Sequence, residues 1–262
     1  MRTSLRHFLL LLTLAGVLAG RGTGAAAQTA GGSDSQSPVT SVISGPGISS
    51  IPDNPVAEVR DKRSWELAPF VNYGNGFGNR DQYRFLSAGV EFGKILTPVF
   101  HAGFVSGQFQ LAGSIMPLWM AFTPGPHQET RKCDQPGGGT SFCIVPVGGG
   151  TFHGVSIMPV IFRWNFLTHS RRFQPWFQGA GGLIYTTHKF PPDVLYPHGL
   201  PGGTSVWNFS PQGGFGIHYF TRARRSIDLG VNAVHLSSAS LGDRNPGVNA
   251  SIQVQLGYTF WR

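Results

Sequence analysis

Apolar and polar residues alternate along much of the chain, most clearly near its end. From Ala250 to Phe260 the even-numbered residues are apolar or aromatic, and the odd-numbered residues are polar or glycine. From Val105 to Leu111 the odd-numbered residues are apolar or glycine and the even-numbered residues are polar. A repeat of two residues is that of a β-strand, because successive side chains point to opposite faces. Both segments therefore predict strands whose two faces meet different surroundings.

Eight segments of this kind are predicted from residue 64 onward, with no amphipathic helix and no stretch long enough for a membrane-spanning helix. They are residues 64–73, 83–95, 102–122, 151–166, 173–187, 204–220, 226–238 and 249–261. Most exceed about ten residues, which suits tilted membrane strands, whereas strands of soluble proteins average about five or six. The connections after the second, fourth and sixth segments are short, and most of the others are longer and rich in Gly, Pro and polar residues.

This pattern predicts an all-β fold, an eight-stranded antiparallel transmembrane β-barrel with short periplasmic turns and longer external loops. Its apolar face would meet lipid, and its polar face would line an interior small enough for side chains to fill. Inside it, Glu66, Glu91 and Asp228 are expected to form a polar network with Arg84 or Arg163, because buried charges need partners. A soluble all-β domain is the alternative, and the strand lengths argue against it.

The N-terminus has the features of an export signal. Arg2 and Arg6 precede an apolar run, and small residues follow it up to Ala27. The run is too short for a typical membrane-spanning helix. We expect a signal peptide over residues 1–27, cleaved after Ala27, a flexible periplasmic leader over 28–63 and the barrel over 64–262. An uncleaved N-terminal anchor is the alternative.

Composition and net charge limit the classes of molecule that the protein can be expected to bind. Only 12% of the 262 residues are charged, compared with about a quarter in typical soluble domains. Removal of the signal peptide takes away three arginines and no acid, so the net charge of +8 falls to +5. The remaining basic residues are spread over short segments, which excludes a continuous nucleic-acid-binding face and suits weak contact with an anionic membrane.

Cys133 and Cys143 are the only cysteines, and they lie in a Gly-rich segment. Two cysteines in an exported chain favour a disulfide that closes a loop. A metal site is the alternative, but it would need more ligands than the nearby His127 supplies. No cofactor or metal is expected.

Candidate chemistry lies at the end of the seventh predicted strand. His235 and Ser237 are two residues apart, so they project from one face, and they share it with Leu229, Val231 and Ala233. This is the apolar, outward face. A histidine beside a serine is the minimum for nucleophilic hydrolysis, because imidazole can accept the hydroxyl proton. A polar pair at this end of a lipid-facing surface points to a substrate in the outer leaflet.

The residues from His235 to Ala239, followed by Asn245-Pro246-Gly247-Val248-Asn249, resemble the signature of the lipid A 3-O-deacylase (PagL-like, acyloxyacyl hydrolase) family. The resemblance is sharp over about 30 C-terminal residues, and family members are eight-stranded outer-membrane barrels. It implies that Ser237 is the nucleophile, that His235 is the general base and that Asn245 stabilises the oxyanion. The implied reaction is cofactor-free hydrolysis of the 3-linked acyl chain of lipid A, the lipid part of lipopolysaccharide, in the outer leaflet of the outer membrane.

Two residues depart from the family signature. Ser238 stands where the family has Asn, so an expected oxyanion donor is altered. Asn249 stands where the family has the Glu that orients the histidine, and alternation places it on the polar face, away from His235. Asn249 is the expected orienting residue, with Asp243 as an acidic substitute. A barrel of the same fold with weak or no catalysis, or an acyltransferase, are the alternative functions.

Overall fold

The computed structural model describes residues 54–134, 137–147, 149–191, 205–239, 241–242 and 249–262. The predicted signal peptide and most of the predicted leader lie outside these residues. Within them, no helix is long and apolar enough to cross a membrane. The strands are β1 (Trp65–Gly76), β2 (Arg84–Ile95), β3 (Gly107–Phe122), β4 (His127–Asp134), β5 (Thr140–Val147), β6 (Thr151–Phe166), β7 (Phe173–Phe190), β8 (Ser205–Phe209), β9 (Gln212–Arg222), β10 (Arg225–His235) and β11 (Ala250–Trp261).

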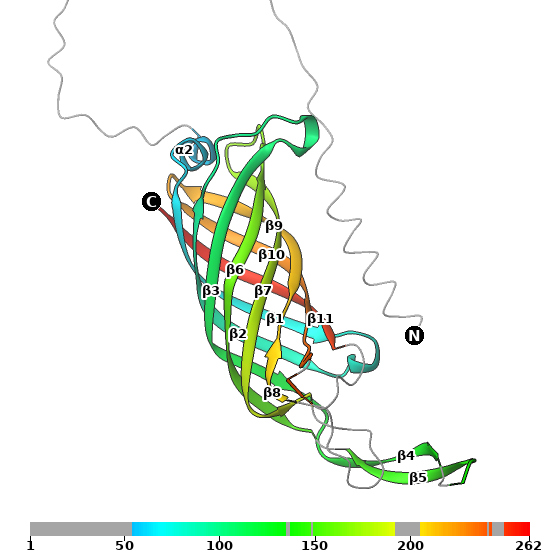
Figure 1. Cartoon of the computed structure of the whole chain (residues 1–262). Coiled ribbons are helices and arrows are strands. Elements are labelled where there is room, and N and C mark those ends of the chain that lie inside the picture. The colour runs from blue at the N-terminus through cyan, green and yellow to red at the C-terminus, as the bar shows by residue number, and fades with distance from the viewer. Residues whose placement is uncertain (1–53, 135–136, 148, 192–204, 240, 243–248) are drawn as a thin grey trace, which may run out of the picture. The chain divides into compact units, whose positions relative to one another are not determined.

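All of these strands except β4 and β5 form one closed antiparallel barrel (Figure 1). Neighbours follow the order β6, β3, β2, β1, β11, β10, β9 and β7, and β7 pairs with β6 to close the wall. Both β8 and β9 pair with β7, so they form one wall strand, which is interrupted at Ser210 and Pro211. The wall described here therefore has eight strands, and the predicted eight-stranded antiparallel β-barrel is confirmed.

Burial along the wall follows the predicted alternation. In β11 the odd-numbered residues from Ser251 to Thr259 are buried, whereas Ile252, Val254 and Leu256 are exposed. The burial pattern of β1 also alternates along nearly its whole length. Polar side chains thus line the interior and apolar side chains cover the outside, as a barrel surrounded by lipid requires.

Arg163 is the centre of a buried polar network in the barrel interior. Its Nη1 lies 3.0 Å from Glu66 Oε1, its Nη2 lies 2.6 Å from Glu91 Oε1, and it also donates to Gln178 Oε1. The network predicted from sequence therefore forms around Arg163.

The two other charged residues predicted for this network have different partners. Arg84 is not part of the network, because its guanidinium donates to the backbone carbonyls of Asp81 and Tyr83 in a turn. Asp228 instead accepts a bond from His218 Nδ1 at 2.6 Å.

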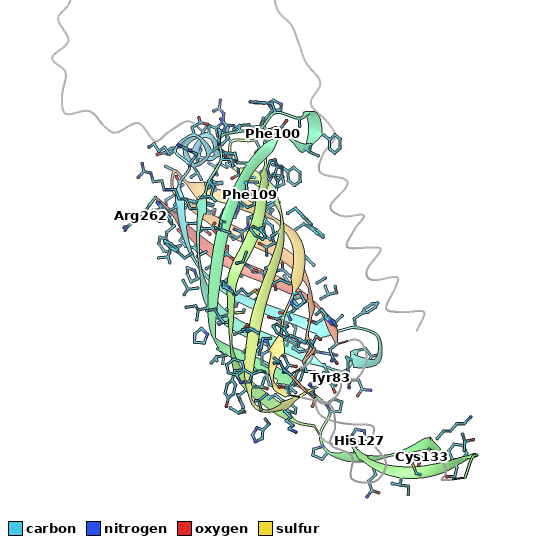
Figure 2. The ribbon with its side chains drawn as sticks, in the orientation of Figure 1. Tyr83, Phe100, Phe109, His127, Cys133 and Arg262 are labelled. Atoms are coloured by element: carbon cyan, nitrogen blue, oxygen red, sulfur yellow. A yellow bond between two sulfur atoms is a disulfide. The ribbon has the colours of Figure 1, made fainter. Side chains whose placement is uncertain are left out.

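The two ends of the barrel carry different elements, and we name them the α2 end and the hairpin end. The α2 end carries the helix α2 (Pro55–Asp61) and Arg262, and the hairpin end carries β4, β5 and Tyr83 (Figure 2). At the α2 end the connection between β2 and β3, residues 96–106, is longer than expected. The third strand begins at Gly107 rather than residue 102, after the short 3-10 helix η3 (Gly103–Val105).

Helix α2 lies inside the segment predicted as a flexible leader. The Asn54 side chain caps it by accepting the Ala57 N–H, and Val56 and Val59 are buried with Ile95, Phe220 and Trp261. Glu58 binds Arg224 in the turn between β9 and β10 at 3.0 Å. Hydrogen bonding from Lys62, and then from Arg224, lowers the pKa of Glu58, although burial opposes the shift. The helix was not predicted because it buries only two apolar side chains, Val56 and Val59.

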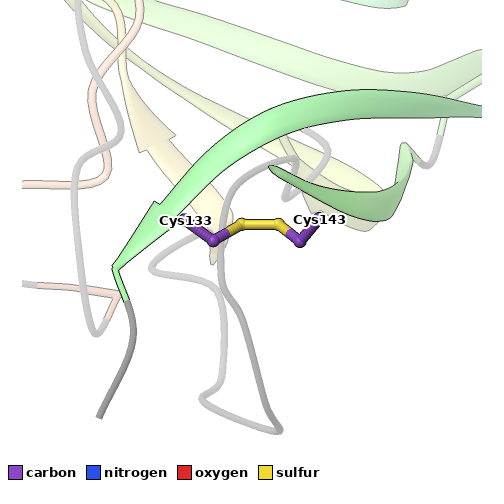
Figure 3. Close-up of a disulfide and its surroundings, with 2 residues drawn as sticks. All are labelled: Cys133 and Cys143. Atoms are coloured by element: carbon purple, nitrogen blue, oxygen red, sulfur yellow. A yellow bond between two sulfur atoms is a disulfide. The ribbon is translucent and has the colours of Figure 1, made fainter. Parts of the chain in front are cut away.

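At the hairpin end, β4 and β5 pair only with each other. A disulfide joins Cys133 in β4 to Cys143 in β5, with their Cα atoms 6.0 Å apart (Figure 3). This is the pairing that the sequence favoured over a metal site, although the two strands themselves were not expected. The hairpin lies in the connection between β3 and β6.

Candidate active site

The end of β10 holds His235 and Ser237 on the outer face of the barrel. Both side chains are partly exposed and Ala233 on the same face is exposed, whereas the intervening Val234 and Leu236 are buried. The backbone fixes this arrangement. His235 N–H donates to the Pro211 carbonyl at 2.9 Å, and Ser237 exchanges two backbone bonds with Phe209, of 2.7 and 3.0 Å. The parity expected from the sequence therefore places both side chains on the lipid-facing side, at the hairpin end.

The hydroxyl of Ser237 lies beside a backbone donor. Its Oγ accepts the N–H of Ala239 at 3.1 Å. Ala239 has a φ of 45°, in the left-handed region that non-glycine residues avoid. Such strained positions concentrate at functional sites. No sequence pattern points to Ala239, because only the backbone conformation reveals its position beside Ser237.

The ring of His235 makes no hydrogen bond within the part of the chain that the structure describes. His235 and Ser237 are thus brought to one surface without a bond between imidazole and hydroxyl. In enzymes without substrate such bonds are often long, and they tighten when the substrate is bound.

Two further residues of the predicted site, Ser238 and Asn249, lie in the described part of the chain, and their side chains point into the barrel and not toward lipid. Ser238 and Asn249 are buried on the inner face of the wall. Asn249 Oδ1 accepts Arg80 Nε at 3.1 Å, so the structure gives Asn249 a partner other than His235. Alternation along the strand explains this orientation, and no bulge reverses it in β11. Asn245 and Asp243 lie outside the described residues.

An apolar hollow of about 350 Å³ lies in the outer wall beside this pair. It is lined by Pro159, Gly181, Gly182, Leu183, Phe209 and Pro211. Phe209 and Pro211 are the residues whose backbones bond to Ser237 and His235, so the hollow begins next to the pair.

Glycine keeps the hollow open on β7. A Cβ added at Gly181 would meet no atom within 4 Å, so its absence leaves open space on the lipid-facing side. One row of cross-strand neighbours, Ser237, Phe209, Leu183 and Ile157, borders the hollow and crosses from the end of β10 to β6. Three strand spacings give it a span of about 14 Å. The sequence did not reveal this hollow, because strand register brings its residues together.

Residues 144–259 match the family model described as lipid A 3-O-deacylase (PagL). No curated protein matches the sequence. Among solved structures, the outer membrane enzyme PagL has 15% identity and a TM-score of 0.43, with 74% of this chain and 98% of that chain covered.

Two other solved barrels are similar to a comparable degree. Neisserial surface protein A has 11% identity and a TM-score of 0.43, with 75% and 96% of the two chains covered. The N-terminal β-barrel domain of Pseudomonas aeruginosa OprF has 12% identity and a TM-score of 0.35, with 76% and 98% covered. The family match includes His235, Ser237 and Asn249, and it falls on a closed eight-stranded wall. The chain is therefore a closed eight-stranded β-barrel that is similar, over residues 144–259, to the lipid A 3-O-deacylase (PagL) family.

Proposed function

We propose that this protein is an outer-membrane esterase that hydrolyses the 3-O-linked acyl chain of lipid A, with Ser237 as nucleophile and His235 as general base. One observation carries the proposal. A histidine and a serine project together from a lipid-facing surface, where polar side chains are disfavoured unless they lie near the interface or are used. The match of residues 144–259 to the deacylase family supports the choice of substrate.

In the first half of the reaction, Ser237 Oγ attacks the ester carbonyl carbon while His235 takes the hydroxyl proton. The carbonyl oxygen becomes an oxyanion. When the tetrahedral intermediate collapses, the bond to the 3-oxygen of lipid A breaks, and the protonated His235 returns its proton to that oxygen. The acyl chain is then an ester of Ser237, and lipid A carries a free 3-hydroxyl.

In the second half, His235 takes a proton from water as the water oxygen attacks the acyl-serine ester. Collapse of the second intermediate releases the fatty acid, and the proton returns to Ser237 Oγ. No cofactor is needed, because the two side chains carry all the proton transfers.

A backbone donor lies next to the attacking oxygen, because the Ala239 N–H donates to Ser237 Oγ at 3.1 Å. We propose that this N–H turns to the oxyanion as the tetrahedral intermediate forms. By the family resemblance Asn245 supplies a second donor. Loss of one such donor typically costs about a hundredfold or more in rate.

The substrate reaches the site from the membrane. The apolar hollow beside Phe209 and Pro211 gives the scissile acyl chain a place along the barrel wall. This fits an exported chain whose signal peptide is removed after Ala27 and whose external end faces lipopolysaccharide in the outer leaflet.

The test is mass spectrometry of lipid A from Gram-negative cells that express the wild type or Ser237→Ala, with equal amounts of folded barrel. Thr187→Ala is the matched control, because it removes an exposed hydroxyl from the same end of the barrel. We expect loss of one 3-hydroxyacyl chain with the wild type and with Thr187→Ala, and intact lipid A with Ser237→Ala. Intact lipid A with folded wild type would favour a structural barrel that lacks catalysis.

A further inference from the structure

Leu236 stands between the two proposed catalytic residues and points into the barrel. Its side chain is only 1% exposed and belongs to a cluster with Tyr83 and Phe190. Its N–H donates to the backbone carbonyl of Asn249 at 2.8 Å. The outward direction of His235 and Ser237 thus depends on how firmly Leu236 is held on the inner side.

The side chain of Asn249 is held by Arg80. Asn249 Oδ1 accepts Arg80 Nε at 3.1 Å, across 169 residues of sequence. Asn249 Nδ2 is buried without a partner in the described part of the chain. The bond from Arg80 is therefore the side-chain contact that orients this amide.

Arg80 is itself fixed by Tyr83. Its Nη1 donates to the Tyr83 hydroxyl at 2.9 Å, and its guanidinium carbon lies 5.2 Å from the centre of the Tyr83 ring. The Tyr83 ring lies 6.3 Å from that of Phe190, in the cluster that receives Leu236. Burial raises the pKa of Tyr83, with Arg80 opposing the shift. The hydroxyl therefore stays neutral near physiological pH.

These contacts form a continuous ring on the inner side of the wall at the proposed site. Arg80 contacts Asn249, Asn249 contacts Leu236, and Leu236 packs in the aromatic cluster with Tyr83, which in turn binds Arg80. We infer that Arg80 is a positioning residue for the His235–Ser237 pair and acts on it through Asn249. The inference deepens the proposed function and rests on it. Arg80 lies outside the residues matched by the family model, so the match does not assign it this role.

The first test is Arg80→Met in the full-length protein, assayed for lipid A deacylation in mixed micelles. Misplaced reacting groups slow the chemical step, so we expect kcat to fall about tenfold or more with little change in KM. Arg80→Lys should also fall, because lysine keeps the charge but cannot form the two-pronged contact. This second variant keeps the test valid if Arg80→Met does not fold.

Arg84→Met is the matched control, since it removes an equal charge from the same turn. Its guanidinium donates to the backbone carbonyls of Asp81 and Tyr83 and not to Asn249. An equal fall in kcat in Arg84→Met would show that positive charge in this turn matters and not the contact with Asn249. A change confined to KM in Arg80→Met would show that the reacting groups are still in place. Either result would overturn the inference.

A double variant tests whether Arg80 acts through Asn249. If it does, Arg80→Met combined with Asn249→Ala should lower kcat no further than the more severe single variant. Additive losses would overturn the inference.

Hydrogen exchange at the Leu236 amide separates this inference from the proposed function, because it needs no activity. We expect exchange about tenfold faster in Arg80→Met and unchanged in Arg84→Met. If the wild type does not cleave lipid A, the proposed function fails, and faster exchange in Arg80→Met alone would still show that Arg80 positions the end of this strand. Unchanged exchange would overturn that role whether or not the wild type is active.

Discussion

Polar residues occur on both faces of the barrel wall, but they are held very differently. Inside, the guanidinium of Arg163 is bound by Glu66, Glu91 and Gln178, and its side chain is only 3% exposed. Outside, His235 is partly exposed, and its ring makes no hydrogen bond within the described residues.

This difference distinguishes polar residues that stabilise the fold from polar residues that are candidates for catalysis. A buried charge must be paired, because an unpaired one destabilises the fold, so the interior network follows from stability alone. The outward pair satisfies no such need, because leucine or valine would suit a lipid-facing position better. Polar residues that the fold does not require are the better candidates for chemistry.

The largest effect should come from breaking the interior network. Arg163→Met leaves Glu66 and Glu91 buried without their cation, so we expect a loss of about 3–5 kcal/mol in the free energy of unfolding. Denaturant unfolding in detergent, followed by the heat-modifiable gel shift, measures it.

Replacing the two glutamates as well provides the control. The variant Arg163→Met with Glu66→Gln and Glu91→Gln should recover much of the loss, because no unpaired charge remains. A loss below about 1 kcal/mol in Arg163→Met alone would mean that the interior network is not structural.

The second prediction concerns the outer face. His235→Leu should change the free energy of unfolding by less than about 0.5 kcal/mol, because leucine suits this surface. The rate of lipid A deacylation should fall at least about a hundredfold, since the general base is gone. Activity in micelles and denaturant unfolding of the same preparation give both values.

His153→Leu is the matched control, because His153 is also exposed near the hairpin end of its strand, β6. It should retain activity. A clear loss of stability in His235→Leu would remove the contrast between the two faces, and His235 would then be structural.

Much of this fold could be predicted because lipid and a polar interior impose strict alternation on every wall strand. The same local rule placed His235 and Ser237 outside and Asn249 inside. Helix α2 and the β4–β5 hairpin escaped prediction, because short elements with few apolar residues leave little periodic signal.

The surroundings of the candidate site could not be predicted, because they depend on strand register. Phe209 meets Ser237 only through pairing between β8 and the end of β10, and Arg80 reaches Asn249 from 169 residues earlier in the sequence. Alternation revealed which way each side chain points but not its neighbours. The resemblance assigned Asn249 to His235, and only the structure shows that Arg80 binds its side chain.

The prediction with the smallest expected effect concerns whether the hollow in the outer wall binds the acyl chain by its shape. A Cβ added at Gly181 meets no atom within 4 Å, so Gly181→Leu extends into open space on the outer face and the barrel should fold normally. If the scissile chain lies there, the rate on long-chain esters should fall about tenfold, equivalent to losing contact with about two methylene groups, while short-chain esters are still cleaved.

Ala88→Leu is the control, because it adds bulk to the outer face of β2, away from β7. Equal rates for Gly181→Leu and Ala88→Leu on esters of every length would mean that the hollow does not bind the chain. The outer face would then contribute only the His235–Ser237 pair, and selection of the substrate would have to arise elsewhere.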